Sequence, residues 1–226
     1  MRASTNRGTE TDLRIEHMRA DQLEESVEFL AKTYEAAPGF LELSDRNSPA
    51  EVRERFRQAV TACLTHTDCA FVATDSTGRM LGCICAIPQI RERFSEWIQR
   101  WNRDPWRTSR GLWIKGWHWI ATRLRPSRSY GDYGRLQQSQ APRVGCVCVL
   151  NLAVDPEFRG CGIARRLIEI AERHWRFHTM LVATRVETWA EENRRIYERM
   201  GFTLFADGRR GQTSCYTLLR EFEDQP

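Results

Sequence analysis

The sequence predicts an α/β domain, and the clearest sign of this class is one stretch in the second half of the chain. In residues 147–154 apolar side chains occupy odd and even positions alike, as in a central strand covered on both faces. A short loop with two glycines follows, and then a helix with Ile163, Leu167 and Ile170 on one side and charged residues on the other. A strand, a tight loop and a helix in direct succession are typical of a sheet flanked by helices.

The segments before this stretch supply further strands and two helices. Asp21 and Glu24 are spaced as a capping box, and the helix after them carries apolar residues at helical spacing as far as Tyr34. Ser48 begins a second helix, because a proline follows it at the first helical position and a glutamate at the third. The strands expected in this part are residues 13–18, 70–74 and 80–87, the last two joined as a hairpin.

After the central stretch the chain returns to the sheet. A strand ends at residues 186–189, and the helix that follows ends before Gly201, a residue that tolerates the positive φ found just beyond helix ends. Residues 202–205 and 212–219 are expected to form a closing hairpin, with its turn at Asp207 and Gly208.

Length and composition indicate one domain with an insertion. The chain has 226 residues, of which 41% are hydrophobic, so it can bury one sizeable core. We expect a disordered lead at residues 1–11 and a single domain at residues 12–226, with an insertion at about 89–142. No apolar run approaches the roughly 18 residues of a membrane span, and the first residues lack the apolar core of a signal peptide. A cytoplasmic protein is therefore expected.

The eight cysteines are not spaced as a typical metal site. None forms a Cys-x-x-Cys pair, and Cys83, Cys85, Cys146 and Cys148 alternate within expected strands like small apolar residues. A zinc site built from these two Cys-x-Cys pairs is the weaker alternative, because the tight turns that carry zinc ligands are missing. No metal is expected.

The loop after the central strand has the composition of an anion site. It contains Gly160 and Gly162 directly before a helix, so successive N–H groups can turn toward one point at a helix end that carries partial positive charge. A P-loop would need Gly-Lys-Ser/Thr, and a dinucleotide-binding fingerprint would need glycine where Arg165 stands. Neither motif fits, although phosphate remains the natural ligand.

Two motifs, in order, resemble those of the GNAT (GCN5-related N-acetyltransferase) superfamily. The pyrophosphate loop of that family, Gln/Arg-x-x-Gly-x-Gly/Ala, is matched by Arg159, Gly162 and Ala164, and residues 193–202 are similar to its Asn-x-x-x-Tyr-Glu-x-x-Gly-Phe element. The resemblance implies a mixed, mostly antiparallel sheet flanked by helices. The insertion, which is rich in Trp and Arg and expected to be helical, would lie between the third and fourth strands.

The resemblance also implies an acyl-CoA cofactor, with acetyl-CoA as the acyl donor. In this family the fourth and fifth strands splay apart, and the pantetheine arm pairs with exposed main-chain groups of the fourth strand, as an added strand would. The cofactor-binding residues implied are Leu152, Ala153, Val154, Arg159, Gly160, Cys161, Gly162, Ile163, Ala164, Asn193 and Tyr197.

Acyl transfer to an amine needs a base, an oxyanion donor and a proton for the leaving thiolate. The resemblance assigns Tyr197 as the general acid and the N–H of Val154 as the oxyanion donor. Some members carry a glutamate on the fourth strand where this chain has Cys148, so the base stays open. The candidates are Glu187, His118, Asp132 and a water chain linked to solvent.

The expected insertion has a composition of its own. Residues 90–128 hold six of the eight tryptophans and carry ten basic against three acidic residues. Amphipathic helices that pack on the core are one interpretation, and a lid over the acceptor site, with Trp113, Trp117 and His118 meeting the substrate, is another. Peripheral contact with an anionic membrane is the third. Nucleic acid is not an expected partner, because no module that reads nucleic acid accompanies the basic residues.

These observations predict an acyl-CoA-dependent N-acyltransferase that acts without a metal. The favoured form transfers acetyl to a primary amine of a small molecule or a protein by direct attack. A longer-chain acyltransferase with an enlarged apolar site is one alternative, and a non-catalytic acyl-CoA sensor or scaffold is the other. Homodimerisation is left open.

Overall fold

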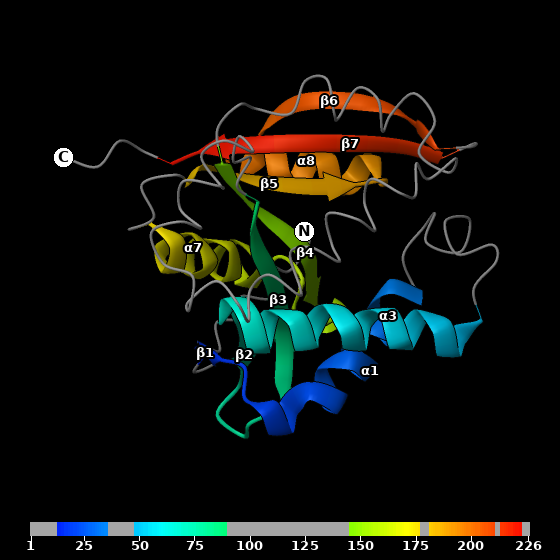
Figure 1. The fold of residues 1–226 in the computed structure, drawn as a ribbon, viewed down its shortest axis with the longest axis vertical. Helices are drawn as coiled ribbons and strands as arrows, with labels where there is room; N and C mark the ends of the chain where they lie inside the picture. The colour runs from blue at the N-terminus through cyan, green and yellow to red at the C-terminus, as the bar shows by residue number, and fades with distance from the viewer. Residues whose placement is uncertain (1–12, 36–47, 90–144, 177–180, 211–212, 223–226) are drawn as a thin grey trace, which may run out of the picture.

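A computed structural model describes residues 13–35, 48–89, 145–176, 181–210 and 213–222. Within these residues the chain forms a seven-stranded sheet in the order β1-β2-β3-β4-β5-β7-β6 (Figure 1). All neighbouring strands are antiparallel except β4 and β5, which run parallel. The predicted mixed, mostly antiparallel sheet flanked by helices is confirmed. The expected lead at 1–11 and, apart from Gln89, the expected insertion at about 89–142 lie outside the described residues.

The elements follow the predicted order. The strands are β1 (Arg14–His17), β2 (Ala70–Thr74), β3 (Met80–Gln89), β4 (Gly145–Val154), β5 (Leu181–Thr188), β6 (Thr203–Arg210) and β7 (Thr213–Glu221). The helices are α1 (Leu23–Glu35), α3 (Pro49–Ala62), α7 (Ile163–Trp175) and α8 (Glu191–Arg199). Three short helical turns complete the described chain: η1 (Ala20–Gln22), η2 (Cys63–Thr67) and η3 (Pro156–Phe158).

The middle of the sheet is buried on both faces. On one face α1 and α3 lie side by side (Figure 1), and their residues Leu30 and Val60 pack against Val72 of β2. On the other face α7 packs against β2, β3 and β4, with Leu167 in the same core cluster as Ile84. This double cover explains why residues 147–154 are apolar at nearly every position.

The structure differs from the sequence prediction at the start of one helix and at one turn. The chain enters α1 through η1, and the Gln22 side chain accepts a hydrogen bond from the N–H of Arg19, so the expected capping box of Asp21 and Glu24 is wrong. Asp207 and Gly208 do not form a turn either, since they pair with Tyr216 and Cys215 inside the β6–β7 ladder. The capping box of Ser48 and Glu51 at the start of α3 is confirmed.

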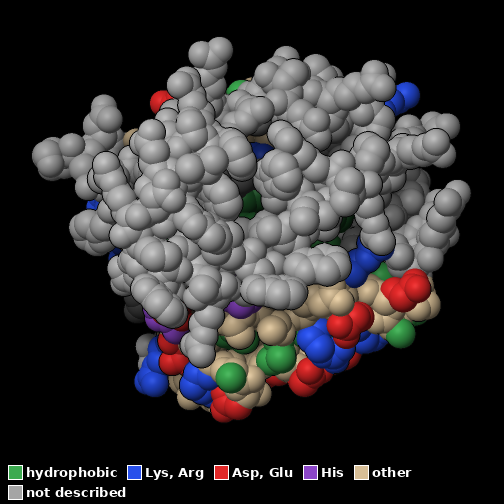
Figure 2. Space-filling model, in the orientation of Figure 1, with side chains coloured by type: hydrophobic (Ala, Val, Ile, Leu, Met, Phe, Trp, Pro, Cys, Tyr) green, Lys and Arg blue, Asp and Glu red, His purple; other side chains and the backbone are tan. Residues whose placement is uncertain are grey.

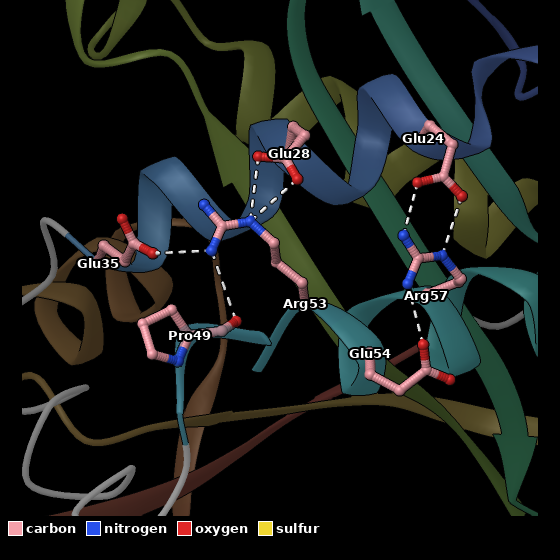
Figure 3. A network of polar contacts seen from close by, with 7 residues as sticks. All are labelled: Glu24, Glu28, Glu35, Pro49, Arg53, Glu54 and Arg57. Atoms are coloured by element: carbon pink, nitrogen blue, oxygen red, sulfur yellow. Dashed lines mark hydrogen bonds and ion pairs between the residues drawn. The ribbon is translucent and has the colours of Figure 1, made fainter. Parts of the chain in front are cut away.

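A row of ion pairs joins α1 to α3 (Figure 3). Arg57 forms two hydrogen bonds with Glu24, at 2.9 and 2.6 Å, and a third with Glu54 of its own helix. One turn earlier on α3, the Nε of Arg53 contacts both carboxylate oxygens of Glu28, at 2.9 and 3.2 Å. The described surface in Figure 2 accordingly shows acidic and basic side chains interspersed where α1 and α3 lie. Exposed pairs contribute little each, so their main effect is to fix how the two helices sit on each other.

A second ion pair ties α7 to the C-terminal half of the sheet. Arg220 of β7 donates to Glu172 of α7 at 3.0 and 2.5 Å, and to the carbonyl oxygen of Met200 at 2.8 Å. Thr184 of β5 donates to the same carboxylate at 2.6 Å. The side chains of Arg220 and Glu172 are both less than 20% exposed, so the ion pair is shielded from water. The hydrogen bonds to it therefore hold the surrounding elements in fixed positions. This ion pair therefore holds α7, β5 and β7 together.

Candidate active site

The sheet opens between β4 and β5. The two strands pair from Gly145 opposite Leu181 to Cys148 opposite Arg185, and no further. Beyond that point β5 continues to Thr188 paired only with β7, while β4 continues to Val154 paired only with β3. In Figure 1 β4 runs steeply across the view while β5 and β7 run nearly level. Among the residues that the structure describes, one edge of β4 therefore has no partner strand over its last residues.

A bulge in β4 accompanies the opening. Cys85 of β3 pairs with Asn151 and the next residue, Ala86, pairs with Val149, so Leu150 is an extra residue without a partner. Bulges bend a strand and increase its twist, and they recur beside functional sites. Leu150 is 38% exposed, among the most exposed large apolar side chains of the described residues. The bulge lies directly after the last β4–β5 pair and turns β4 away from β5.

Main-chain N–H groups face the open edge of β4. The N–H of Leu152 donates to the hydroxyl oxygen of Tyr34, 3.4 Å away, and so points away from β3. Because main-chain groups alternate in direction along an antiparallel strand, Val154 faces the opening too and Ala153 faces β3. The N–H of Asp155 donates to the carbonyl oxygen of Leu81 at 2.9 Å, as this alternation requires. Of the three residues predicted to meet an extended arm, Leu152 and Val154 direct their N–H groups toward the open edge, and that of Leu152 already donates to Tyr34.

The loop after β4 is held by Asp155 and Arg79. Asp155 accepts from the N–H of Glu157 at 2.9 Å and from the guanidinium of Arg79 at 2.8 Å. Burial opposes its charge, but these two donors prevail and hold the pKa of Asp155 below its usual value. Arg79 also lies over the ring of Phe158, with its Cζ 5.4 Å from the centroid. The path from β4 into the loop is therefore fixed by polar contacts at both ends of η3.

The predicted glycine loop ends in unpaired donors at the start of α7. Gly160 and Gly162 have φ angles of 83° and 78°, which only glycine adopts readily. Gly162 is the N-cap residue and provides no side-chain cap, so the N–H groups of Ile163 and Ala164 make no bond to the described main chain. A Cβ built on either glycine would meet nothing within 4 Å. The loop thus leaves open space directly above a helix N-terminus, where an anion is stabilised.

Two donors of the predicted loop are already used. The N–H of Arg159 donates to the carbonyl oxygen of Pro156 and that of Cys161 to the carbonyl oxygen of Phe158, each at 3.4 Å. Both side chains are exposed. An anion at this loop would therefore rely mainly on the N–H groups from Gly162 onward, with the Arg159 guanidinium as a flexible counter-charge.

Tyr197 lies on α8 with a partly buried side chain. Its ring meets Phe202 edge-on at 5.7 Å, and Gly201, with a φ of 90°, ends the helix as predicted. Burial raises the pKa of Tyr197 to about 12. Its hydroxyl has no hydrogen-bond partner among the described residues, so the proton is available to a ligand. Asn193 lies one turn earlier on α8 and is exposed.

Glu187 faces the opposite side of the sheet. Thr184 contacts α7 and Val186 belongs to the core under it, so the alternation of β5 turns Arg185 and Glu187 toward the side of α1 and α3. Arg185 donates to Glu187 at 2.6 Å, and the two side chains are 14% and 33% exposed. Within the described residues the Nε of Arg185 is buried without a partner. Of the other predicted site residues, Trp113, Trp117, His118 and Asp132 lie outside the described residues.

Tyr34 is a site residue that the sequence analysis assigned only to the buried face of a helix. Its hydroxyl reaches Leu152 at the open edge, and its ring lies 5.2 Å from Phe56 and 6.1 Å from Trp189. Burial raises the pKa of Tyr34 well above its usual value, and the nearby Tyr197 adds to the rise. The two tyrosines come from different helices, Tyr34 from α1 and Tyr197 from α8.

The described residues contain no group of three His, Cys, Asp or Glu side chains that could hold a metal ion. In the same part of the chain, no helix combines the length and the apolar character needed to cross a bilayer.

Part of the sequence and the fold are similar to those of GNAT acetyltransferases. Residues 118–204 match the family described as "Acetyltransferase (GNAT) domain", a span that includes β4, α7, β5 and α8. The fold also matches solved acetyltransferases of this type. The resemblance to the GNAT superfamily that the two sequence motifs carry is thereby confirmed.

Three of the matching structures illustrate the relationship. An apo-form mutant of agmatine N-acetyltransferase is 18% identical, with 93% of this chain and 100% of that chain covered and a TM-score of 0.61. A polyamine N-acetyltransferase of Drosophila melanogaster that forms N-acetylagmatine is 18% identical, with the same coverage and a TM-score of 0.60. Arylalkylamine N-acetyltransferase 2 of Aedes aegypti is 14% identical, with 93% and 99% covered and a TM-score of 0.61. No curated protein matches the sequence. At these identities the structures share the fold with this chain, and the acceptor is a separate question.

Proposed function

We propose that the protein is an acetyl-CoA-dependent N-acetyltransferase that acetylates a primary amine of a small molecule. The observation that carries this proposal is the open edge of β4, toward which the N–H of Val154 points and that of Leu152 points with Tyr34 as its partner. The chain then continues to the N–H groups of Ile163 and Ala164, which have no main-chain partner among the described residues. An extended arm with amide groups can pair with the first set while its pyrophosphate meets the second. Asn193 would contribute a further contact to the arm.

The reaction follows from the groups around the opening. The amine nitrogen attacks the thioester carbonyl carbon and loses a proton to a base, while the carbonyl oxygen becomes an oxyanion near the N–H group of Val154. When the C–S bond breaks, Tyr197 gives its proton to the departing sulfur. A buried phenol with a pKa of about 12 is protonated at neutral pH, as a proton donor must be.

Direct attack is preferred over an acyl-cysteine intermediate. Cys148 is the thiol beside the point where the strands separate, and burial raises its pKa to about 11. A thiol in that state is a weak nucleophile at neutral pH, because the thiolate is the reactive form.

Glu187 is the proposed base on the acceptor side. Its carboxylate lies beside the opening and is oriented by Arg185 through one hydrogen bond of 2.6 Å.

The acceptor class is supported by the structural neighbours, which include enzymes of agmatine and of arylalkylamines. The experiment is a panel of agmatine, spermidine, tyramine and an unblocked peptide, assayed for release of free CoA thiol and for the acetylated product by mass spectrometry. We expect product with a small amine. Binding of acetyl-CoA without product from any acceptor would favour the sensor alternative, and the absence of binding would overturn the cofactor assignment.

A further inference from the structure

Tyr34 lies across the opening between β4 and β5. Its hydroxyl accepts a hydrogen bond from the N–H of Leu152 on β4, while its ring packs near Trp189, the residue directly after β5. The same ring packs on Phe56 of α3. Three rings from α1, α3 and the end of β5 therefore border the opening on the side of α1 and α3.

These rings are held from behind. α1, which carries Tyr34 near its end, is joined to α3 by the contacts of Arg57 with Glu24 and of Arg53 with Glu28 (Figure 3). Phe56 is 7% exposed and belongs to the core between these helices and the sheet. The Tyr34 ring cannot retreat without disturbing that core, so it acts as a rigid wall.

The wall stands at the acyl end of the donor. The pyrophosphate is proposed to lie at the start of α7, beyond the end of β4, so an arm running along the open edge reaches Val154 first and Leu152 next. Its thioester thus comes to the level of Leu152, where the Tyr34 hydroxyl already lies.

We propose that Tyr34 and Trp189 limit the acyl group to a short chain. The proposal rests on the proposed function and adds the determinant of acyl length at the same site. An acetyl group ends before the rings, whereas each further methylene must occupy the space that the Tyr34 ring fills. Pockets of this kind discriminate by roughly 10-fold or more per methylene, because a packed wall cannot move aside.

The test compares acetyl-, butanoyl- and hexanoyl-CoA with the whole chain. The variants are Tyr34→Ala and Trp189→Ala, which remove parts of the wall, and Tyr34→Phe, which keeps the ring and removes the hydroxyl. Phe29→Ala is the matched control, because Phe29 is a partly buried ring on α1 that packs on the same core. Two quantities are measured for each acyl-CoA: kcat/KM with the best amine, and the Kd by calorimetry.

We expect Tyr34→Ala to shift the butanoyl-to-acetyl ratio of kcat/KM by at least about tenfold in favour of butanoyl. Trp189→Ala should shift it in the same direction, while Tyr34→Phe and Phe29→Ala keep the wild-type ratio. Unchanged ratios in both wall variants would overturn the proposal. If one wall variant fails to fold, the other carries the test.

Calorimetry separates this proposal from the proposed function. If no acyl-CoA is turned over with any amine, the acetyltransferase proposal fails, but the ratio of Kd values still tests whether Tyr34 limits chain length. If wild-type protein turns over acetyl-CoA and the wall variants keep its chain-length preference, only the wall proposal fails.

Discussion

Gly82 joins the two halves of the proposed donor site, and Gly82→Ala should impair both. A Cβ at this position would lie 2.9 Å from the carbonyl oxygen of Ala153 on β4. It would also lie 3.1 Å from Cγ2 of Ile163 and 3.3 Å from Cδ1 of Leu167, both on α7. The first contact is with main chain, so rotation of a side chain cannot relieve it. β3 and β4 must therefore shift against each other, and α7 must also give way slightly at the other two contacts.

The magnitude follows from overpacking. One methyl group inserted into a well-packed core costs about 1–3 kcal/mol, which for a chain of this size lowers Tm by about 2–12 °C. The shift moves the N–H groups of β4 or of the α7 N-terminus by a few tenths of an ångström. Since both sets are proposed to bind acetyl-CoA, its Kd should rise on the order of tenfold, equivalent to about 1.4 kcal/mol.

The assay pairs thermal unfolding with calorimetry of acetyl-CoA. Val72→Ala is the control, because Val72 is fully buried on β2 against α1 and α3 and its truncation costs stability without touching α7. The control should lower Tm and leave the Kd unchanged. If Gly82→Ala is also destabilised but binds acetyl-CoA like wild type, the positions of β4 and α7 are not what holds the donor, and the reasoning is refuted.

Three further predictions concern the donor loop and the acid. Gly162→Val should abolish acetyl-CoA binding, because a β-branched residue opposes the φ of 78° and fills the space above the α7 N-terminus; unchanged affinity by calorimetry would contradict the assignment. Tyr197→Phe should lower kcat on the order of 10²-fold with little change in the Kd of acetyl-CoA, and a mutant with the parent rate would make Tyr197 structural. With a pKa of about 12, Tyr197 stays protonated across the usual range, so a pH–rate profile should show no alkaline loss from this group below about pH 11. If the wild-type enzyme loses activity below that pH and Tyr197→Phe abolishes this loss, the pKa of Tyr197 is not raised by burial.

The sequence predicted the parts of the fold whose patterns are local. β4 is buried on both faces and α7 has one apolar side, so periodicity alone locates both. The positive φ of Gly201 was expected from the helix-end pattern. The closing hairpin was predicted, but its turn was not, because Asp-Gly is a strong turn signal that here yields to pairing with Tyr216 and Cys215.

The sequence could not show which residues meet across the sheet. Tyr34 fits the apolar face of α1, and only the fold reveals that its hydroxyl reaches Leu152 through a gap in the sheet. Gly82 lies in no turn and has no positive φ that would mark it. Glycine is needed there because β4 and α7 approach closely. The sequence carries no signal for the bulge at Leu150 either, since the bulge depends on the register of β4 with β3. Each of these facts is a tertiary one.

The opening gives the proposed reaction its direction. The unpaired donors at the start of α7 lie on the α7 side, whereas Arg185 and Glu187 face α1 and α3. An intact sheet would keep the two sides apart, because paired strands leave no passage. Past Cys148 the pairing of β4 with β5 stops and the extra residue Leu150 bends β4, and the Tyr34 hydroxyl reaches the N–H of Leu152 at this point. In the proposed reaction the donor therefore enters from one face and the amine from the other, and they meet only where the sheet is open, which requires direct transfer.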